Sequence, residues 1–135
     1  PDSITNIGDK AFGECYSLKA VCLKGDAPTV FSGTFTNANQ VKIYYSSSTS
    51  GWGATLGGQS TAIWPTFTGV QVSSGNLVMD TEGTDGEIYV LEICTNLSNV
   101  VWTPVETNTV SSGVLEFQTN TSSNSAARFF RIVIE

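Results

Sequence analysis

Four carboxylates within eight residues form the densest cluster of side chains that could do chemistry. They are Asp80, Glu82, Asp85 and Glu87. Ca²⁺ prefers several hard oxygen ligands, so a calcium site is one prediction, although the spacing is not that of an EF-hand loop. A pair of these acids would also suit glycoside hydrolysis, but the sequence implies no aromatic-lined cleft around them. The sequence favours a solvated hairpin turn shaped by Gly83 and Gly86.

Aromatic side chains form a second candidate site, because their flat faces can stack on sugar rings. They are Tyr44, Tyr45, Trp52, Trp64 and Trp102. A carbohydrate-binding platform would use Tyr45, Trp52 and Trp64. The competing interpretation, which we favour, is that Trp64 and Trp102 fill a core or the junction between two halves of the chain.

Three cysteines and no histidine limit the remaining chemistry. Without histidine the chain lacks the usual zinc ligands, the Ser-His-Asp triad and the Cys-His dyad. Cys15, Cys22 and Cys94 form no CxxC pair, and their odd number leaves at least one thiol free. We expect three unpaired thiols; a Cys22–Cys94 bridge is the alternative and requires both side chains to face outward. The sequence therefore predicts a protein that is not an enzyme and has no cofactor.

Charge and composition argue against several classes of partner. The net charge is −6 and 13% of residues are charged, with no cluster of Lys or Arg. Nucleic acids and anionic membrane surfaces both demand a basic face, so neither is an expected partner. No run of about 18 apolar residues is present, so we expect no membrane insertion. A surface rich in Ser, Thr and Asn suits β-structure and an extracellular or cell-surface location.

The elements that must position these residues fall into two segments, and the first is residues 1–64. Its apolar residues alternate short extended pieces with tight turns, as a solenoid coil does. Thr34-Phe35 repeats the place of Ala11-Phe12 at the interval of one repeat, which indicates a second, degraded copy of the same unit. Val41 and Ile43 come about three residues short of the register of the first repeat, and the strand predicted over 41–45 closes this second copy. Residues 46–62 are expected to form a loop that Trp52 holds in place.

The second segment, residues 66–135, shows one candidate strand after another. Six candidates are 67–72, 76–80, 87–95, 101–108, 114–119 and 127–134. Gly- or Asn-rich turns separate them, the last at 122–125. Short strands at this spacing predict a small antiparallel β-sandwich, so the fold class of the chain is expected to be mainly β.

The motif IxxIGxxAFxxCxxLxxV, which runs from Ile4 to Val21, resembles the BspA-like leucine-rich repeat of bacterial and protist surface proteins. The match spans nearly every defining position of one repeat. It implies that residues 1–64 are the truncated end of a leucine-rich-repeat solenoid with its cap. The first repeat would then expose apolar edge residues that a neighbouring coil normally covers. These edge residues are Ile4, Ile7, Phe12, Leu18 and Val21.

The segments YVLEICTNLSNVVWTPV and AARFFRI resemble a fibronectin-like C-terminal module of large bacterial secreted proteins. The resemblance covers residues 66–135 and implies a small antiparallel β-sandwich at an extracellular address. It implies almost nothing about chemistry. Cys94 stands where the module usually has a small polar residue, so we expect its side chain near the surface.

Two functions fit these features. The first is a non-catalytic extracellular or cell-surface protein for adhesion or protein binding, with the sandwich as a spacer or attachment module. The second is a self-assembling subunit of an extracellular filament, in which a neighbouring copy covers the open N-terminal repeat end and gives a homo-oligomer. The chain begins at Pro1 without an initiator Met, so we expect a processed form or part of a longer protein.

Overall fold

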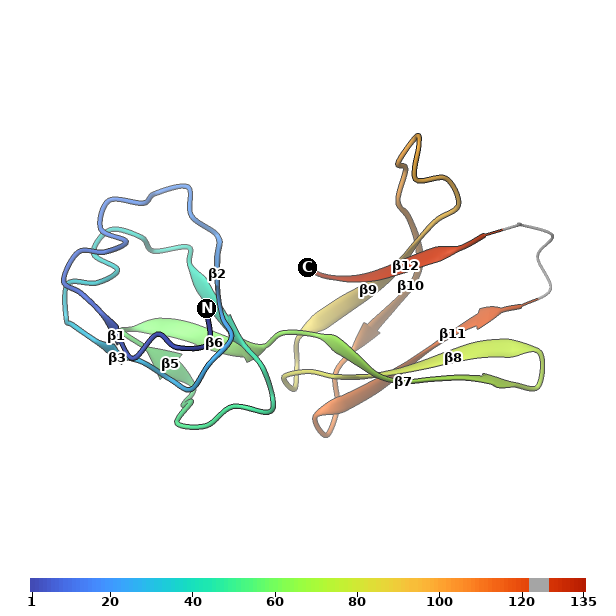
Figure 1. Cartoon of the computed structure of the whole chain (residues 1–135), viewed down its shortest axis with the longest axis horizontal. Helices are drawn as coiled ribbons and strands as arrows, with labels where there is room; N and C mark the ends of the chain where they lie inside the picture. The colour runs from blue at the N-terminus through green and yellow to red at the C-terminus, as the bar shows by residue number, and fades with distance from the viewer. Residues whose placement is uncertain (122–126) are drawn as a thin grey trace. The chain divides into compact units, whose positions relative to one another are not determined.

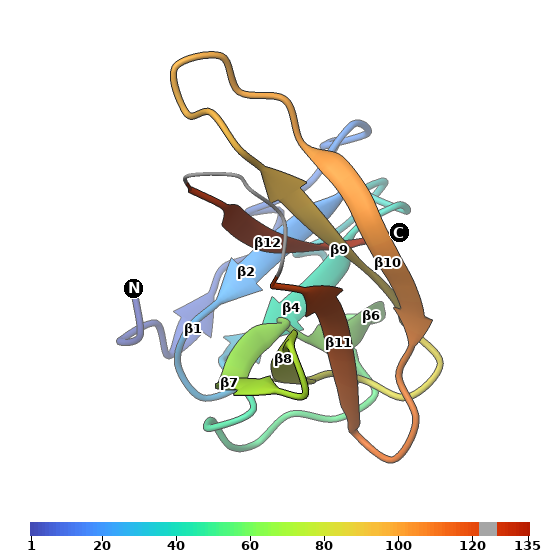
Figure 2. The same ribbon diagram turned by 90° about the vertical axis from the view of Figure 1, so that its right-hand side faces the viewer.

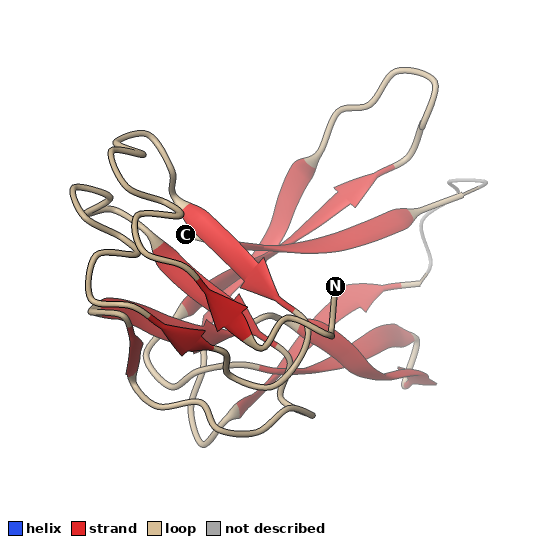
Figure 3. Cartoon of the chain, turned by 60° about the vertical axis from the view of Figure 1, so that its left-hand side comes forward, coloured by secondary structure: helices blue, strands red, loops and turns tan. Residues whose placement is uncertain are grey.

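The computed structural model describes residues 1–121 and 127–135, and this part of the chain consists of strands and loops without a helix (Figure 3). The mainly β fold class is therefore confirmed. The chain divides into two compact units, Pro1–Trp64 and Pro65–Glu135 (Figure 1). The turn predicted at 122–125 lies outside the described residues.

The first unit is built from short strands that pair mainly in parallel. Its strands are β1 (Asn6–Ile7), β2 (Ala20–Leu23), β3 (Thr29–Val30), β4 (Lys42–Tyr45), β5 (Thr55–Leu56) and β6 (Gln59–Ile63). β1 pairs with β3, and β2, β4 and β6 form a second parallel sheet, to which β5 adds antiparallel beyond β6. Parallel neighbours need a crossover connection, so the chain passes round in successive coils. We call residues 1–23 the first coil, 24–45 the second and 46–64 the third.

Strand register sets the length of these coils. Asn6 lies opposite Thr29, and Ala20 lies opposite Lys42, so the second interval is shorter than the first by a single residue. β4 therefore begins only one residue earlier than an exact repeat would place it. The predicted shift of about three residues is wrong. The reason is that Val41 has the place in the second coil that Leu18 has in the first. The N–H of each residue donates to the carbonyl oxygen three residues earlier and closes the same kind of tight turn.

The predicted loop over 46–62 is also wrong in its second half, because β5 and β6 form a hairpin there. Gly57 and Gly58 make its turn with φ angles of 58° and 85°, which suit glycine. β6 then pairs with β4 in parallel, and Ala62 becomes buried. Gln59–Ile63 is a polar segment without alternating apolar residues. It forms a strand because its backbone pairs with the neighbouring strand β4.

The core of the first unit lies between the two parallel ladders. Its buried members are Ile7, Leu23, Phe35, Ala38, Val41 and Ile43. The rings of Phe12 and Phe35 stack face to face, with centroids 5.2 Å apart and planes 4° from parallel. The repeated Phe position in the sequence therefore corresponds to one layer of side chains lying directly on the next.

The second unit contains two antiparallel three-stranded sheets (Figure 2). Its strands are β7 (Thr66–Ser73), β8 (Asn76–Glu82), β9 (Ile88–Cys94), β10 (Thr103–Thr109), β11 (Val114–Asn120) and β12 (Phe129–Ile134). The sheet orders are β11-β8-β7 and β10-β9-β12. All six predicted strands are confirmed within about two residues at each end.

One apolar cluster joins the two sheets of this unit. Its buried members are Met79, Tyr89, Leu91, Val110 and Phe117. Cys94, predicted near the surface, is buried instead, and that prediction is wrong. The chain after β9 folds back, so that the thiol donates to the carbonyl oxygen of Asn96 at 3.3 Å. The condition for a Cys22–Cys94 bridge, that both side chains face outward, is therefore not met.

Candidate functional site

The first coil, residues 1–23, is the end of the first unit where the sequence predicts an exposed apolar edge. Among the predicted edge residues, Ile7 is buried, whereas Ile4, Phe12, Leu18 and Val21 are half-buried against the core. The structure thus brings all five together around one coil. Four of them keep part of their apolar surface uncovered.

A comparison between successive coils shows why these side chains stay exposed. Four half-buried residues of the first coil have a buried counterpart in the second. The pairs are Phe12 and Phe35, Cys15 and Ala38, Leu18 and Val41, and Val21 and Ile43. The second coil lies between two other coils, which bury its side chains. The first coil has a neighbouring coil on one side only. The first coil therefore presents the kind of surface that another coil would cover.

The backbone of this end is equally open, because β1 and β2 are edge strands. The N–H of Lys42 donates to the carbonyl oxygen of Lys19 at 2.9 Å, which fixes the alternation along β2. The N–H and C=O groups of Ala20 and Cys22 consequently point away from β4. They have no hydrogen-bond partner among the described residues. We name the first-coil side chains and these two edge strands together the coil end.

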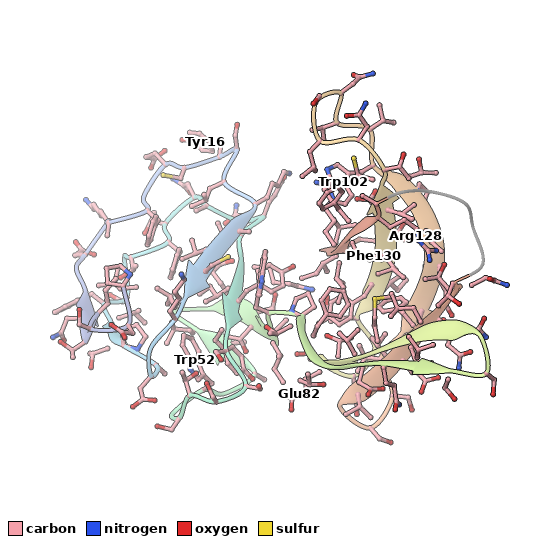
Figure 4. The ribbon with its side chains drawn as sticks, turned by 45° about the vertical axis from the view of Figure 1, so that its right-hand side comes forward. Tyr16, Trp52, Glu82, Trp102, Arg128 and Phe130 are labelled. Atoms are coloured by element: carbon pink, nitrogen blue, oxygen red, sulfur yellow. The ribbon has the colours of Figure 1, made fainter. Side chains whose placement is uncertain are left out.

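Polar side chains hold the coils in register next to the coil end. The amide of Asn37 donates to Glu14 Oε1 at 2.7 Å, and the Tyr16 hydroxyl donates to the other carboxylate oxygen (Tyr16, Figure 4). These two hydrogen bonds, led by that from Tyr16, hold the pKa of Glu14 below its usual value. The Asp26 carboxylate accepts from the Ser50 N–H at 2.7 Å, and its pKa is lowered in the same way. Carboxylates therefore link each coil to the next.

Thr34 is a residue that sequence reasoning missed. Its hydroxyl is fully buried, donates to the Gly8 carbonyl oxygen at 3.0 Å and accepts from the Phe31 N–H at 3.1 Å. It thereby ties the second coil to the backbone of the first. Its position directly before Phe35, in the repeated Ala-Phe place, is the signal that could have identified it.

The acidic cluster is spread along a strand and its turn. Asp80 and Glu82 lie on β8, and Asp85 lies in the turn, where its Oδ1 accepts from the Gly113 N–H at 2.6 Å. Within the described residues, no three His, Cys, Asp or Glu side chains lie together so that they could hold a metal ion. Gly83 is required in this turn, because a Cβ there would lie 2.2 Å from Tyr89 Cε2. The acidic segment therefore forms a tight turn with a structural role, which we call a corner.

The predicted aromatic platform is divided between two faces. Tyr45 and Trp52 stack on each other at 4.6 Å, with planes 6° apart, and Trp52 Nε1 donates to Thr49 Oγ1 (Trp52, Figure 4). Trp64 meets Tyr44 edge to face at 5.5 Å. Because neighbouring strand residues point to opposite faces, Tyr44 and Tyr45 separate Trp64 from Trp52. The three residues do not make one sugar-stacking surface.

The cysteine at the coil end carries a protonated thiol. Cys22 is exposed on β2, yet partial burial raises its pKa above the usual value. A thiol of raised pKa is a poor nucleophile at neutral pH. Cys22 therefore contributes an edge backbone position to the coil end and little reactivity.

Comparison with known proteins finds no family model, no curated protein and no solved structure that matches this chain. Over the ranges 1–121 and 127–135, no helix is long and apolar enough to cross a membrane.

Proposed function

We propose that the chain is a non-catalytic extracellular protein-binding module, and that its binding surface is the coil end. One observation carries this proposal: the coil end combines half-buried apolar side chains with backbone groups of Ala20 and Cys22 that have no partner among the described residues. A surface with both features suits a partner that adds a strand and an apolar layer together. The partner is therefore a polypeptide coil of similar build.

Several features support a BspA-like leucine-rich-repeat solenoid as the framework of this surface. Strand partners recur at nearly equal intervals along the chain, Asn6 with Thr29 and Ala20 with Lys42. The side-chain layer repeats with the same period in the Phe12–Phe35 stack. The Ile4–Val21 motif and the low charge support the extracellular setting. The acidic segment serves as a corner and the aromatic residues are divided, so catalysis and sugar binding have less support.

The opposite end of the first unit bears on the filament alternative. There β5 turns back antiparallel beside β6 and occupies the edge of the β2-β4-β6 sheet. A second copy would need a matching open parallel edge at that end in order to stack head to tail. The hairpin favours a different protein as the partner over a filament of identical copies.

Titration calorimetry of the full chain tests this function. The probe is a soluble peptide that carries two tandem copies of residues 1–23, used under reducing conditions. We expect saturable binding to the wild-type chain. Cys22→Pro removes an outward N–H without breaking the ladder with β4, and we expect it to weaken binding about tenfold or more, equal to about 1.4 kcal/mol.

Cys22→Ser is the matched control, because it changes the same side chain and keeps the N–H. Wild-type affinity in Cys22→Pro, or no binding by the wild-type chain, contradicts the proposal. An intact-mass measurement on native material adds a separate check. A mass far above 14.3 kDa, with further repeats ahead of Pro1, would place the covering coil on the same polypeptide and contradict a separate partner.

A further inference from the structure

The second unit leaves one side of its two-layered core uncovered. Val70 and Val72 of β7 lie opposite Met79 and Leu77 of β8, so they share the inward face of that sheet with core residues. Inward-facing valines should be buried, yet Val70 is 61% exposed and Val72 is 68% exposed. Among the described residues, no strand of the facing sheet covers them.

β12 forms the other border of the same opening. Its inward side chains, Phe130, Ile132 and Ile134, contact the core cluster but remain only half-buried. β12 is also an edge strand. We name these three side chains, together with Val70 and Val72, the open side.

The free backbone groups of β12 point into this opening. The Glu135 N–H donates to the Ile88 carbonyl oxygen at 3.1 Å, which fixes the alternation of hydrogen-bonded pairs between β12 and β9. The N–H and C=O groups of Phe130, Ile132 and Ile134 therefore face away from β9 and have no partner among the described residues. An occupant that satisfies them must itself be an extended strand.

The opposite side of the unit is closed. The Asn108 amide donates to the Glu116 carbonyl oxygen at 3.0 Å, and the Gln118 N–H donates to Glu106 at 2.8 Å, so side chains of β10 occupy edge groups of β11. Pro104 and a bulge further protect β10. β12 has neither a proline nor a bulge among its described residues, and β7 has a bulge only near its start, between Phe67 and Gly69. Arg131 is the single charged side chain of these two strands.

We propose that the open side binds a second copy of this chain by antiparallel pairing of the two β12 strands about a two-fold axis at Ile132. Directly opposite residues of an antiparallel pair share a face. Ile132 would meet Ile132 of the second copy, and Phe130 would meet its Ile134. The strand thus supplies the alternating apolar residues that its own opening requires, and the added layer extends over Val70 and Val72.

The charged residues near β12 are compatible with this pairing. Arg131 is held on the outer face by Glu92, with Nε 2.6 Å from Oε2, and its guanidinium lies 4.5 Å from the centre of the Trp102 ring. Its cross-strand neighbour would be Val133, so no like charges meet. Arg128 donates to the Asn120 carbonyl oxygen and lies over Phe130 at one end of the opening (Figure 4).

Sedimentation velocity of the full chain tests the dimer. We expect a concentration-dependent species of twice the 14.3 kDa chain mass that does not grow further, because two-fold pairing closes. Val72→Lys places a charge in the opening at an exposed position, and we expect a monomer. Circular dichroism checks that this variant keeps its strands.

Val114→Lys is the matched control, because Val114 is 58% exposed on β11, at the closed side, and this variant should dimerise like the wild type. Cys22→Pro should also leave the dimer intact, which separates this surface from the coil end. A wild-type chain that stays monomeric up to its solubility limit overturns the proposal. So does a dimer that Val72→Lys and Val114→Lys affect equally, or an open series of larger species.

Discussion

At the residue scale, Thr34 shows how a single buried hydroxyl can order the first unit. The coil that precedes it offers carbonyl groups, and a buried carbonyl or N–H without a partner is costly. The Thr34 hydroxyl accepts a hydrogen bond from the Phe31 N–H and donates one to the Gly8 carbonyl oxygen. The coil end therefore depends on a polar contact beneath its apolar surface.

Thr34→Val should destabilise the first unit by about 1–3 kcal/mol, because it keeps the volume, removes the hydroxyl's bond to the Gly8 carbonyl and leaves the Phe31 N–H without its hydroxyl acceptor. Urea unfolding followed by tryptophan fluorescence measures the change, since Trp52 and Trp64 lie in this unit. Thr34→Ser keeps the hydroxyl and should recover most of the loss. A Thr34→Val chain as stable as the wild type would show that these hydrogen bonds contribute nothing.

Some residue positions could be predicted from sequence and others could not. The spacing of Phe12 and Phe35 predicted their alignment, because a repeat places equivalent residues in successive layers. Cys94 was mispredicted, because its burial depends on how the following chain folds back onto it. The division of Tyr45 from Trp64 was equally hidden, since it rests on the register of β4 against β6.

At the element scale, carboxylates that accept hydrogen bonds from the next coil make the first unit sensitive to acid. We call these hydrogen-bonded links rungs. Glu14 reaches Asn37, and Asp26 reaches Ser50, each one coil further on. Because both folded-state pKa values are lowered, the rungs stabilise the fold above the usual carboxyl pKa. That contribution disappears as the pH falls through the lowered folded-state pKa.

The stability difference between the wild-type chain and Glu14→Gln should therefore depend on pH. We expect the wild type to be the more stable at pH values above the ordinary Glu pKa of 4.5, and the two to converge as Glu14 becomes protonated below it. Urea midpoints across this range measure the difference. Asp2→Asn, which changes an exposed carboxylate in the same unit, is the control. A difference that stays constant with pH would contradict the rung.

Element positions in the second unit were predictable because short alternating strands with turn signals depend on local sequence. The β5–β6 hairpin was not, because Gln59–Ile63 gains its strand character from pairing with β4. The open side was also beyond sequence reasoning. Val70 and Val72 alternate with polar residues as core residues should. They are exposed because no described strand of the facing sheet lies over them.

At the scale of the whole molecule, two units with separate apolar clusters each carry an unpartnered β-edge. The coil end is a parallel edge and the open side an antiparallel one. Parallel and antiparallel strands offer different hydrogen-bond spacing. The two surfaces therefore suit different partners, a coil for the first and a second copy for the second.

Net charge adds a further constraint on the proposed dimer. Each copy carries −6, so two copies repel each other, while the contacts along β12 are apolar and backbone hydrogen bonds. Salt should therefore strengthen the dimer. Raising the ionic strength from about 0.01 M to about 0.1 M shortens the screening length from about 30 Å to about 10 Å, and the dissociation constant should fall severalfold. Sedimentation at the two salt concentrations measures it. A dimer that weakens with salt would be held by charge pairs, which the β12 interface does not provide.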